Sequence, residues 1–456
     1  MYATRSGLRL PAARLRRVAW SLALATLASL LLAPAARAAS GDLVWQRAYS
    51  GGPTSASFFT ALAPAPAGGV FVVGTVTGGP SAMVAARYDI AGQLLWRHTF
   101  SGGGNLNEAV SAVSDHAGDL TVGGYALSAS AQLRPTIIAY GPGGHVRWVK
   151  SDKAQATNTD SLSLAIGPRG DLFAAVSEQR SGANDIVVSR YARSGKRRWT
   201  RVYAAPGANA TSETGMVLDA AGNVYVTGTE FRGPQHDLDV LTLKYDAAGH
   251  RRWVRFWDGS GLPDVGYAIA RAGNGTLFVG GYTTGVSSGD DALLLDYSTG
   301  GTLRWSRTYT GAGADTDYYM RVVALGDGGV AAAGASTAAG VSDVLVARYA
   351  PGGTRRWLKL YGGPDGLGGQ AFAEARGAGG ALYVAGDVMM TASGEDSLLL
   401  KYGKTGARRW ARSHSSPGTA NDFALALAVS GGSVYVAGGQ NAQPGAGDGL
   451  LLRYRP

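Results

Sequence analysis

Eight tryptophans recur along the chain at an almost constant spacing, and this repeat restricts the fold more than any other feature. The repeated residues are Trp45, Trp96, Trp148, Trp199, Trp253, Trp305, Trp357 and Trp410. A period of about 50 residues is typical of proteins built from one small supersecondary unit that is repeated along the chain. We expect Trp199, Trp253, Trp305 and Trp357 to be largely buried between the repeats and to serve packing rather than ligand binding.

Each repeat contains four short segments with the pattern of β-strands. The second segment is Val224–Gly228 in one repeat, the third is Asp291–Tyr297 in the next, and the fourth is Trp305–Tyr309. The second and third segments are apolar at consecutive positions, which indicates strands buried on both faces. No sustained helical period appears after Ala38. The pattern predicts an all-β protein in which four-stranded antiparallel sheets pack face to face as the blades of a β-propeller.

The two ends of the repeat region complement each other. The region opens on a segment of the fourth type, Leu43–Tyr49, and the sequence finishes on one of the third type, Asp448–Tyr454. The first segment would therefore complete the last blade and close the ring. We predict an eight-bladed propeller closed by its N-terminal strand, with seven blades as the alternative.

Residues 1–38 have the composition of an export signal. Arginines precede an uncharged apolar run, Val18–Ala33, and Ala36 and Ala38 offer small residues to a signal peptidase. We expect a signal peptide at residues 1–38, a single propeller domain at residues 39–456, and a periplasmic or extracellular protein with no membrane span after signal removal. Six arginines fall in the signal, so the remainder has 36 basic and 32 acidic residues. That balance argues against nucleic acid as a partner.

The repeat resembles a known class of bacterial sequences. The pattern Ala-x-Asp-x-x-Gly-Asn-Val-Tyr-Val-x-Gly, best seen over residues 217–228, is similar to the bacterial β-propeller repeat family of the SBBP or delta-60 type. The Tyr-x3-Gly-x3-Trp element, as in Tyr245, Gly249 and Trp253, also resembles the tryptophan-docking repeats of quinoprotein propellers. The first resemblance implies a propeller in an exported bacterial protein. The second implies eight blades but no quinone chemistry, because the vicinal cysteine pair of those enzymes has no counterpart in a chain without cysteine.

One column of polar residues, six of them acidic, precedes the first strand of nearly every repeat. The acidic members are Glu108, Asp160, Glu213, Asp264, Asp317 and Asp422, and Gln370 takes the same place in one repeat. Two interpretations are open. The residues could form a ring that attracts cations or a polar ligand at one mouth of the channel. Alternatively, each could cap its own loop by accepting backbone N–H bonds, and recurrence in nearly every blade favours this interpretation.

Departures from the repeat mark a second group of candidate ligand-binding residues. The longest repeat carries extra residues before its third strand, and aromatic residues stand beside carboxylates in the following loops, a combination suited to sugar rings or cationic ligands. The residues are His236, Asp237, Trp257, Tyr267 and Tyr318. Ordinary loop filling and packing between blades is the alternative.

No motif for catalysis or for a metal stands out. The six histidines have no metal-ligand spacing, so we predict no catalytic residue, no metal and no cofactor, and calcium remains open without a motif. We expect a monomeric, exported, non-catalytic binding or protein-interaction scaffold that uses the face with the acidic column, with a protein, a glycan or a small molecule as partner. A propeller hydrolase or lyase acting on a saccharide, lactone or ester, or a structural surface or adhesion protein, are the alternatives.

Overall fold

The computed structural model describes residues 39–456 with a few short gaps. The gaps are residues 53–54, 67, 153–154, 157–160, 181, 207–209, 234–236, 314, 418–420 and 444–445. The side chains of residues 155–156, 441–443 and 446 also lie outside the description. The predicted signal peptide at residues 1–38 falls outside the described residues, so the export signal stays a prediction.

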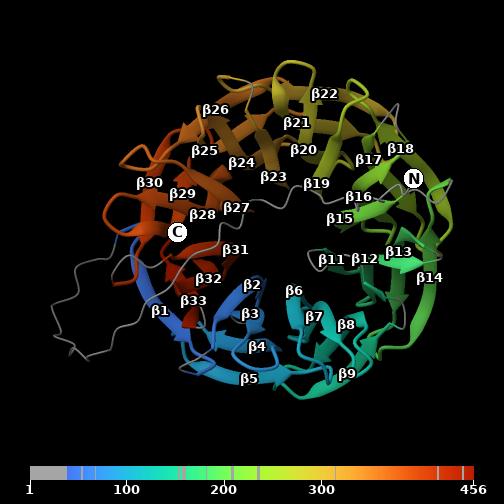
Figure 1. Ribbon diagram of the computed structural model, residues 1–456, viewed down its shortest axis with the longest axis vertical. Coiled ribbons are helices and arrows are strands. Elements are labelled where there is room, and N and C mark those ends of the chain that lie inside the picture. The colour runs from blue at the N-terminus through green and yellow to red at the C-terminus, as the bar shows by residue number, and fades with distance from the viewer. Residues whose placement is uncertain are drawn as a thin grey trace, which may run out of the picture.

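The described strands form eight antiparallel sheets arranged as blades around a central axis (Figure 1). This arrangement confirms the eight-bladed β-propeller, and the seven-bladed alternative is wrong. The first four blades are β2–β5 (Ser57–Pro64, Gly69–Val76, Ala82–Asp89, Leu94–Phe100), β6–β9 (Asn107–Ser114, Leu120–Leu127, Leu133–Tyr140, Val146–Ser151), β10–β14 (Gln155–Ala156, Leu162–Ile166, Leu172–Arg180, Ala183–Tyr191, Arg197–Tyr203) and β15–β18 (Thr211–Leu218, Val224–Phe231, Leu238–Tyr245, Arg251–Trp257).

The other four blades complete the ring. They are β19–β22 (Asp264–Arg271, Leu277–Gly285, Gly289–Tyr297, Leu303–Tyr309), β23–β26 (Asp317–Ala324, Val330–Ala338, Val341–Tyr349, Arg355–Tyr361), β27–β30 (Gly369–Arg376, Leu382–Met390, Gly394–Tyr402, Arg408–His414), and β31–β33 (Phe423–Ser430, Ser433–Gln443, Ala446–Tyr454) with β1 (Leu43–Tyr49). A single turn of 3₁₀ helix, Ala378–Gly380, joins the first two strands of blade 7. No helix in the described part of the chain is both long and apolar enough to cross a membrane.

The N-terminal strand closes the ring as predicted. Strand β1 pairs antiparallel with β33, and Ala48 lies opposite Leu450 in this register. In Figure 1 the blue β1 lies at the outer edge of the red blade that ends the chain. Blade 8 therefore joins residues from the two ends of the repeat region in one sheet.

The repeated Val-Tyr-Val-x-Gly pattern ends on a glycine in the second strand of seven blades, and the structure shows why glycine is needed there. In blade 4, Gly228 lies opposite a β-bulge in the inner strand, and a Cβ there would lie only 1.9 Å from the carbonyl oxygen of Ser212. Only glycine fits so close to another backbone. Blade 3 is the exception, because Val176 stands at this position and its inner strand is split into β10 and β11. Blade 3 thus differs from the other seven both in this residue and in its inner strand.

Each repeated tryptophan docks onto the next blade. The indole N–H of Trp253 donates to the carbonyl of Thr299, 3.1 Å away, in the turn between β21 and β22. In the same turn Gly301 has φ of +84° and packs flat on the Trp253 ring, where a Cβ would come within 2.8 Å. The guanidinium of Arg255 stacks on Trp253 and donates to the Gly301 carbonyl at 2.7 Å. The tyrosine and glycine of one repeat therefore receive the tryptophan of the preceding blade rather than their own.

The same docking contact closes the ring. Trp410 of blade 7 donates to the Ser40 hydroxyl at 3.0 Å and lies against Gly41, which stands four residues before Trp45. Arg412 donates to the Gly41 carbonyl at 2.9 Å. Of the eight tryptophans only Trp410 is buried, and the other seven are half-buried. All eight thus keep the larger part of their surface covered by packing between blades, and the seven half-buried ones stand on outer strands.

Candidate functional site

One face of the ring carries the connections between blades together with the loops between second and third strands. In an antiparallel four-stranded blade the inner strand begins at this face, so the predicted polar column lies near it. We call it the loop face. The opposite face carries the docking turns that receive the tryptophans.

The acidic column does not form one ring. The bulge in each inner strand fixes the register: Glu213 occupies the bulge position opposite Gly228, whereas Asp264 comes two residues before the position opposite Gly281. Glu108 comes one residue before the equivalent position in blade 2. Alternate residues of a strand point to opposite faces of the sheet, so Glu108 faces the other way from Asp264, and Glu213 lies two positions further along its strand than Asp264. Asp160 lies outside the described residues. The interpretation as a single acidic ring is therefore corrected.

Three aspartates of the column act as loop caps. Asp264 accepts the backbone N–H of Gly259 at 2.7 Å, Asp317 accepts that of Gly311, and Asp422 accepts that of Ser416. In blade 2 the cap is an amide, Asn107, which accepts the N–H of Gly102 at 2.6 Å. The capping interpretation is confirmed for these three aspartates, which hold the connections between blades in place.

Glu213 has a different role from the caps. It is completely buried between blades 3 and 4, and neither carboxylate oxygen makes a hydrogen bond of good geometry to the described residues. Burial raises the pKa of Glu213 to about 8, although the nearby hydroxyls of Ser163 and Ser161 oppose the shift. This carboxyl therefore holds its proton at neutral pH and carries no charge that could attract a cation.

A continuous line of aromatic and polar side chains crosses blades 5 to 7 at the loop face. The ring of Tyr267 lies 5.7 Å from that of Tyr282 and meets that of Tyr318 edge-on at 6.1 Å. The Tyr318 hydroxyl donates to the side-chain oxygen of Gln370 at 2.7 Å, and the Gln370 backbone N–H donates to Asp387 at 2.9 Å. With Glu395, which hydrogen bonds to Asp387, these six residues form what we call the tyrosine–carboxyl arc.

The three tyrosines of the arc are neutral hydrogen-bonding groups at neutral pH. Burial raises the pKa of Tyr267 to about 12, and it also raises the pKa values of Tyr282 and Tyr318. Burial and the negative charge of Glu395 hold the pKa of Asp387 well above its ordinary value, and burial raises the pKa of Glu395 as well. Tyr267, Tyr318, Gln370 and Glu395 are each half-buried and so remain partly open to solvent.

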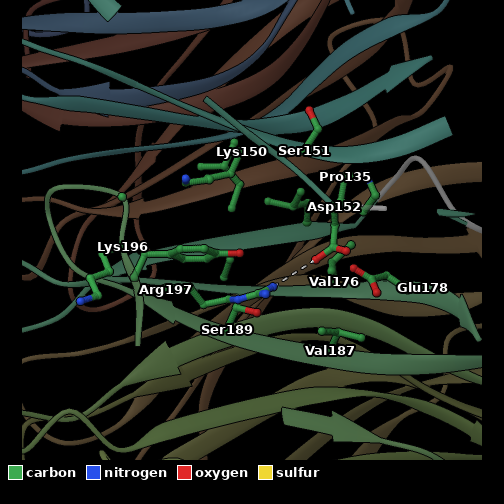
Figure 2. A pocket seen from close by; sticks show the side chains of 15 residues that line it. Pro135, Lys150, Ser151, Asp152, Val176, Glu178, Val187, Ser189, Lys196 and Arg197 are labelled. Carbon is green, nitrogen blue, oxygen red and sulfur yellow. Dashed lines mark ion pairs between the residues drawn. The ribbon is translucent and has the colours of Figure 1, made fainter. Parts of the chain in front are cut away.

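Two cavities lie between blades, away from the arc. One of about 680 Å³ separates blades 2 and 3, next to the irregular inner strand that contains β11. Figure 2 shows Lys150, Asp152, Glu178 and Arg197 around it, with an Asp152–Arg197 ion pair of 3.9 Å. Glu178 is almost fully buried and pairs with Arg180 at 2.8 Å. The two carboxyls at this cavity are thus each paired with an arginine.

The second cavity, of about 620 Å³, lies at the far ends of the inner strands of blades 4 to 7. Arg271, Glu374 and Arg376 line it among apolar side chains. Neither carboxylate oxygen of Glu374 makes a hydrogen bond to the described residues, and burial holds the pKa of this group well above its ordinary value. This cavity is on the opposite side of the ring from the arc.

The remaining sequence candidates fall in three places. Tyr267 and Tyr318 belong to the arc. Trp257 packs, half-buried, against the core between blades 4 and 5, and this position favours the packing interpretation. Asp237 lies in the loop between β16 and β17 with φ of +49° and shares two backbone hydrogen bonds with its own loop. His236 lies outside the described residues.

The sequence did not single out three residues of the arc. Tyr282, Asp387 and Glu395 lie on second and third strands, where an isolated polar or aromatic residue looks like part of an ordinary strand. Their common signal is the register: Tyr282 and Asp387 are both second-strand partners of the residue just before the bulge. In blade 5 the second-strand glycine Gly281 lies opposite the bulge residue Gly266 of the inner strand. Counting back the same number of residues from the second-strand glycine of each blade would have aligned the inner strands correctly.

Comparison with known proteins identifies the fold alone. No protein-family model matches the chain, and no curated protein matches its sequence. The crystal structure of Sqt1 from Chaetomium thermophilum has a TM-score of 0.56 at 11% identity, over 91% of this chain and 98% of that one. Sqt1 bound to the N-terminus of the ribosomal protein L10 gives 0.55 at 12% identity, over 90% and 98%. The β-propeller domain of the Trilobed protease from Pyrococcus furiosus gives 0.42 at 12%, over 80% and 97%. The resemblance to the SBBP or delta-60 type stays a prediction.

Proposed function

We propose that the protein is an exported, non-catalytic binding module that takes its ligand on the loop face of blades 5 to 7. The observation that carries this proposal is the tyrosine–carboxyl arc, because it breaks the symmetry of an otherwise repeating ring. Structural positions recur from blade to blade, as the docking tryptophans do, whereas a ligand site needs a local set of different groups. The arc supplies three phenols, an amide and a carboxyl pair in contact with one another.

The chemistry of the arc suits a polar ligand with apolar faces, such as a glycan or a peptide segment. Tyrosines offer large rigid surfaces and one hydrogen-bonding group each, and they lose little conformational entropy when they bind. Sqt1 was crystallised bound to the N-terminus of a ribosomal protein, so a propeller of similar fold can bind a protein segment. That complex supports a binding role for the present chain.

A propeller hydrolase is the second candidate, because Asp387 and Glu395 are a pair of carboxyls in contact whose pKa values burial raises. The two groups are in direct hydrogen-bond contact, whereas the carboxyls of a glycosidase stand about 5 Å or more apart on either side of the bond. The geometry therefore favours binding over hydrolysis.

Binding and hydrolysis can be separated on arrays of glycans and peptides probed with the mature protein. We expect a ligand that binds saturably, loses affinity in Tyr318→Ala, and keeps it in Tyr361→Ala, which alters a tyrosine on the outer strand β26. The proposal is contradicted if the ligands that bind are insensitive to Tyr318→Ala. Turnover of a bound ligand that is lost in Asp387→Asn would instead support the hydrolase.

A further inference from the structure

Neighbouring blades bring buried aspartates together at the loop face. Asp239 on the third strand of blade 4 lies close to the loop cap Asp264 of blade 5. Burial raises the pKa of Asp264, and the negative charge of Asp239 adds to the rise. Asp291 of blade 5 faces the cap Asp317 of blade 6 in the same way. All four side chains are buried. Two adjacent blade junctions therefore each hold a pair of carboxyls close together in a region of low dielectric.

The junction of blades 4 and 5 has a third carboxylate. Asp258 directly follows β18, and one carboxylate oxygen from each of Asp239, Asp258 and Asp264 can lie within 4.8 Å of the others. In the described part of the chain this is the only group of three acidic or histidine side chains with such spacing. Among the same residues, the junction of blades 5 and 6 has no such group, although Asp315 stands in its loop.

The cap aspartate keeps one oxygen for this cluster. Asp264 has no exposed surface, and its Oδ2 already accepts the Gly259 N–H. Its Oδ1 is buried and makes no hydrogen bond of good geometry to the described residues, although the Thr283 hydroxyl is near enough to lower the pKa of the carboxyl. A buried carboxylate oxygen without a well-placed partner is costly, so this atom indicates that something else satisfies it.

The donor atoms fit a divalent ion. Arg232 donates to Asp239 Oδ2 at 2.7 Å and stacks over Phe256, so it holds this carboxylate at the junction. The donors are all oxygen, as hard cations such as Ca²⁺ prefer, and Asp258 is exposed, so water can complete a shell of about six to eight oxygens.

We propose that Asp239, Asp258 and Asp264 bind a divalent hard cation, Ca²⁺, at the junction of blades 4 and 5. The ion would tie the connection after β18 to strands of both blades. It would also lie close to the arc, since Asp264 pairs across the blade with Thr283, the neighbour of Tyr282. The proposal does not depend on the proposed function. It differs from the sequence analysis, which predicted no metal site.

The direct test is terbium luminescence, because Tb³⁺ replaces Ca²⁺ and Trp257, next to Asp258, can sensitise it. We expect saturable Tb³⁺ emission on excitation of tryptophan, and Ca²⁺ should compete it away. Asp258→Asn alters an exposed residue and should weaken binding at least about tenfold. Asp315→Asn, the matched change in the next loop, should leave binding unchanged.

The two buried loop caps, Asp264 and Asp317, offer a second test by thermal melting. Ca²⁺ should raise the melting temperature of the wild type and of Asp317→Asn but should have no effect on Asp264→Asn. The proposal is overturned if the wild type shows no saturable binding, or if Asp258→Asn and Asp315→Asn bind alike. It is also overturned if Asp264→Asn melts higher than the metal-free wild type while Ca²⁺ leaves the melting temperature of the wild type unchanged. In that case Asp239 and Asp264 share a proton instead of binding an ion.

Discussion

The docking of tryptophan on the glycine of the next blade makes a quantitative prediction for Gly353. This residue has φ of +78°, and a Cβ added there would lie 2.8 Å from the ring of Trp305. Gly170 provides a matched control, since it has φ of +75° in a turn of blade 3 but a Cβ there would meet no atom within 4 Å. Alanine at either position must adopt a left-handed conformation, which costs about 1–2 kcal/mol. Only at Gly353 must the neighbouring tryptophan also move.

We expect Gly170→Ala to lower the free energy of unfolding by about 1–2 kcal/mol. Gly353→Ala should lower it by a further 1–3 kcal/mol or so, roughly the usual effect of overpacking a close contact. Trp305→Ala should cost about 3 kcal/mol, near the lower end for large aromatic residues, because the ring is half-buried. In the Trp305→Ala background, Gly353→Ala should then cost no more than Gly170→Ala.

Urea unfolding followed by far-ultraviolet circular dichroism measures all four free energies without relying on tryptophan fluorescence. The double variant supplies the coupling, which should reach about 1–3 kcal/mol, as expected for residues in contact. Equal losses for Gly353→Ala and Gly170→Ala, or additive effects of Gly353→Ala and Trp305→Ala, would show that the contact contributes nothing to stability.

Two other predictions concern Glu213 and the N-terminal strand. The folded protein holds the Glu213 proton up to about pH 8, whereas the unfolded chain releases it near pH 4.5, so this group lowers stability progressively as the pH rises between those values. Glu213→Gln should therefore gain stability over the wild type across this range, by up to about 5 kcal/mol, and parallel pH profiles of unfolding would contradict the assignment. A protein that starts at Ser50 lacks β1 and exposes the edge of β33, so light scattering should show it aggregating while one that starts at Ala39 stays monomeric. A truncated protein that is monomeric with an unchanged melting temperature would rule out a stabilising role for β1.

The architecture was predictable because it depends on features that are local in the chain. The tryptophan period gave the number of blades, and the complementary segments at residues 43–49 and 448–454 gave the closure. The partner of each tryptophan was not predictable in the same way. Gly249 and Trp253 stand four residues apart in one repeat, yet Gly249 receives Trp199 of the preceding blade. A pattern within one repeat does not distinguish a contact inside a blade from the same contact repeated between blades.

The candidate site was predictable only in part. Tyr267 and Tyr318 were identified as departures from the repeat, and they do come together. The acidic column was misaligned, because its members were matched by residue type and by their distance from one another along the chain rather than by the bulge in each inner strand. A shift of one residue in a strand turns a side chain to the other face, and so Glu108 and Asp264 face different blades. Asp387 and Glu395 meet across strands of the same blade, a contact that sequence spacing does not reveal.

The claim on which the rest depends is that the ring is closed by pairing of β1 with β33. Ala48 and Leu450 lie directly opposite each other in this pairing, where Cα atoms of antiparallel strands are about 4.5–5.5 Å apart and so within the range that a disulfide spans. The chain contains no cysteine, so Ala48→Cys with Leu450→Cys introduces a single candidate pair. Under mild oxidation, mass spectrometry of the unreduced peptides should find these two positions linked within one molecule. The same experiment with Ala48→Cys and Leu451→Cys, whose side chains point to opposite faces, should give no link. Absence of the first link, or its formation only between molecules, would contradict the closed eight-bladed ring.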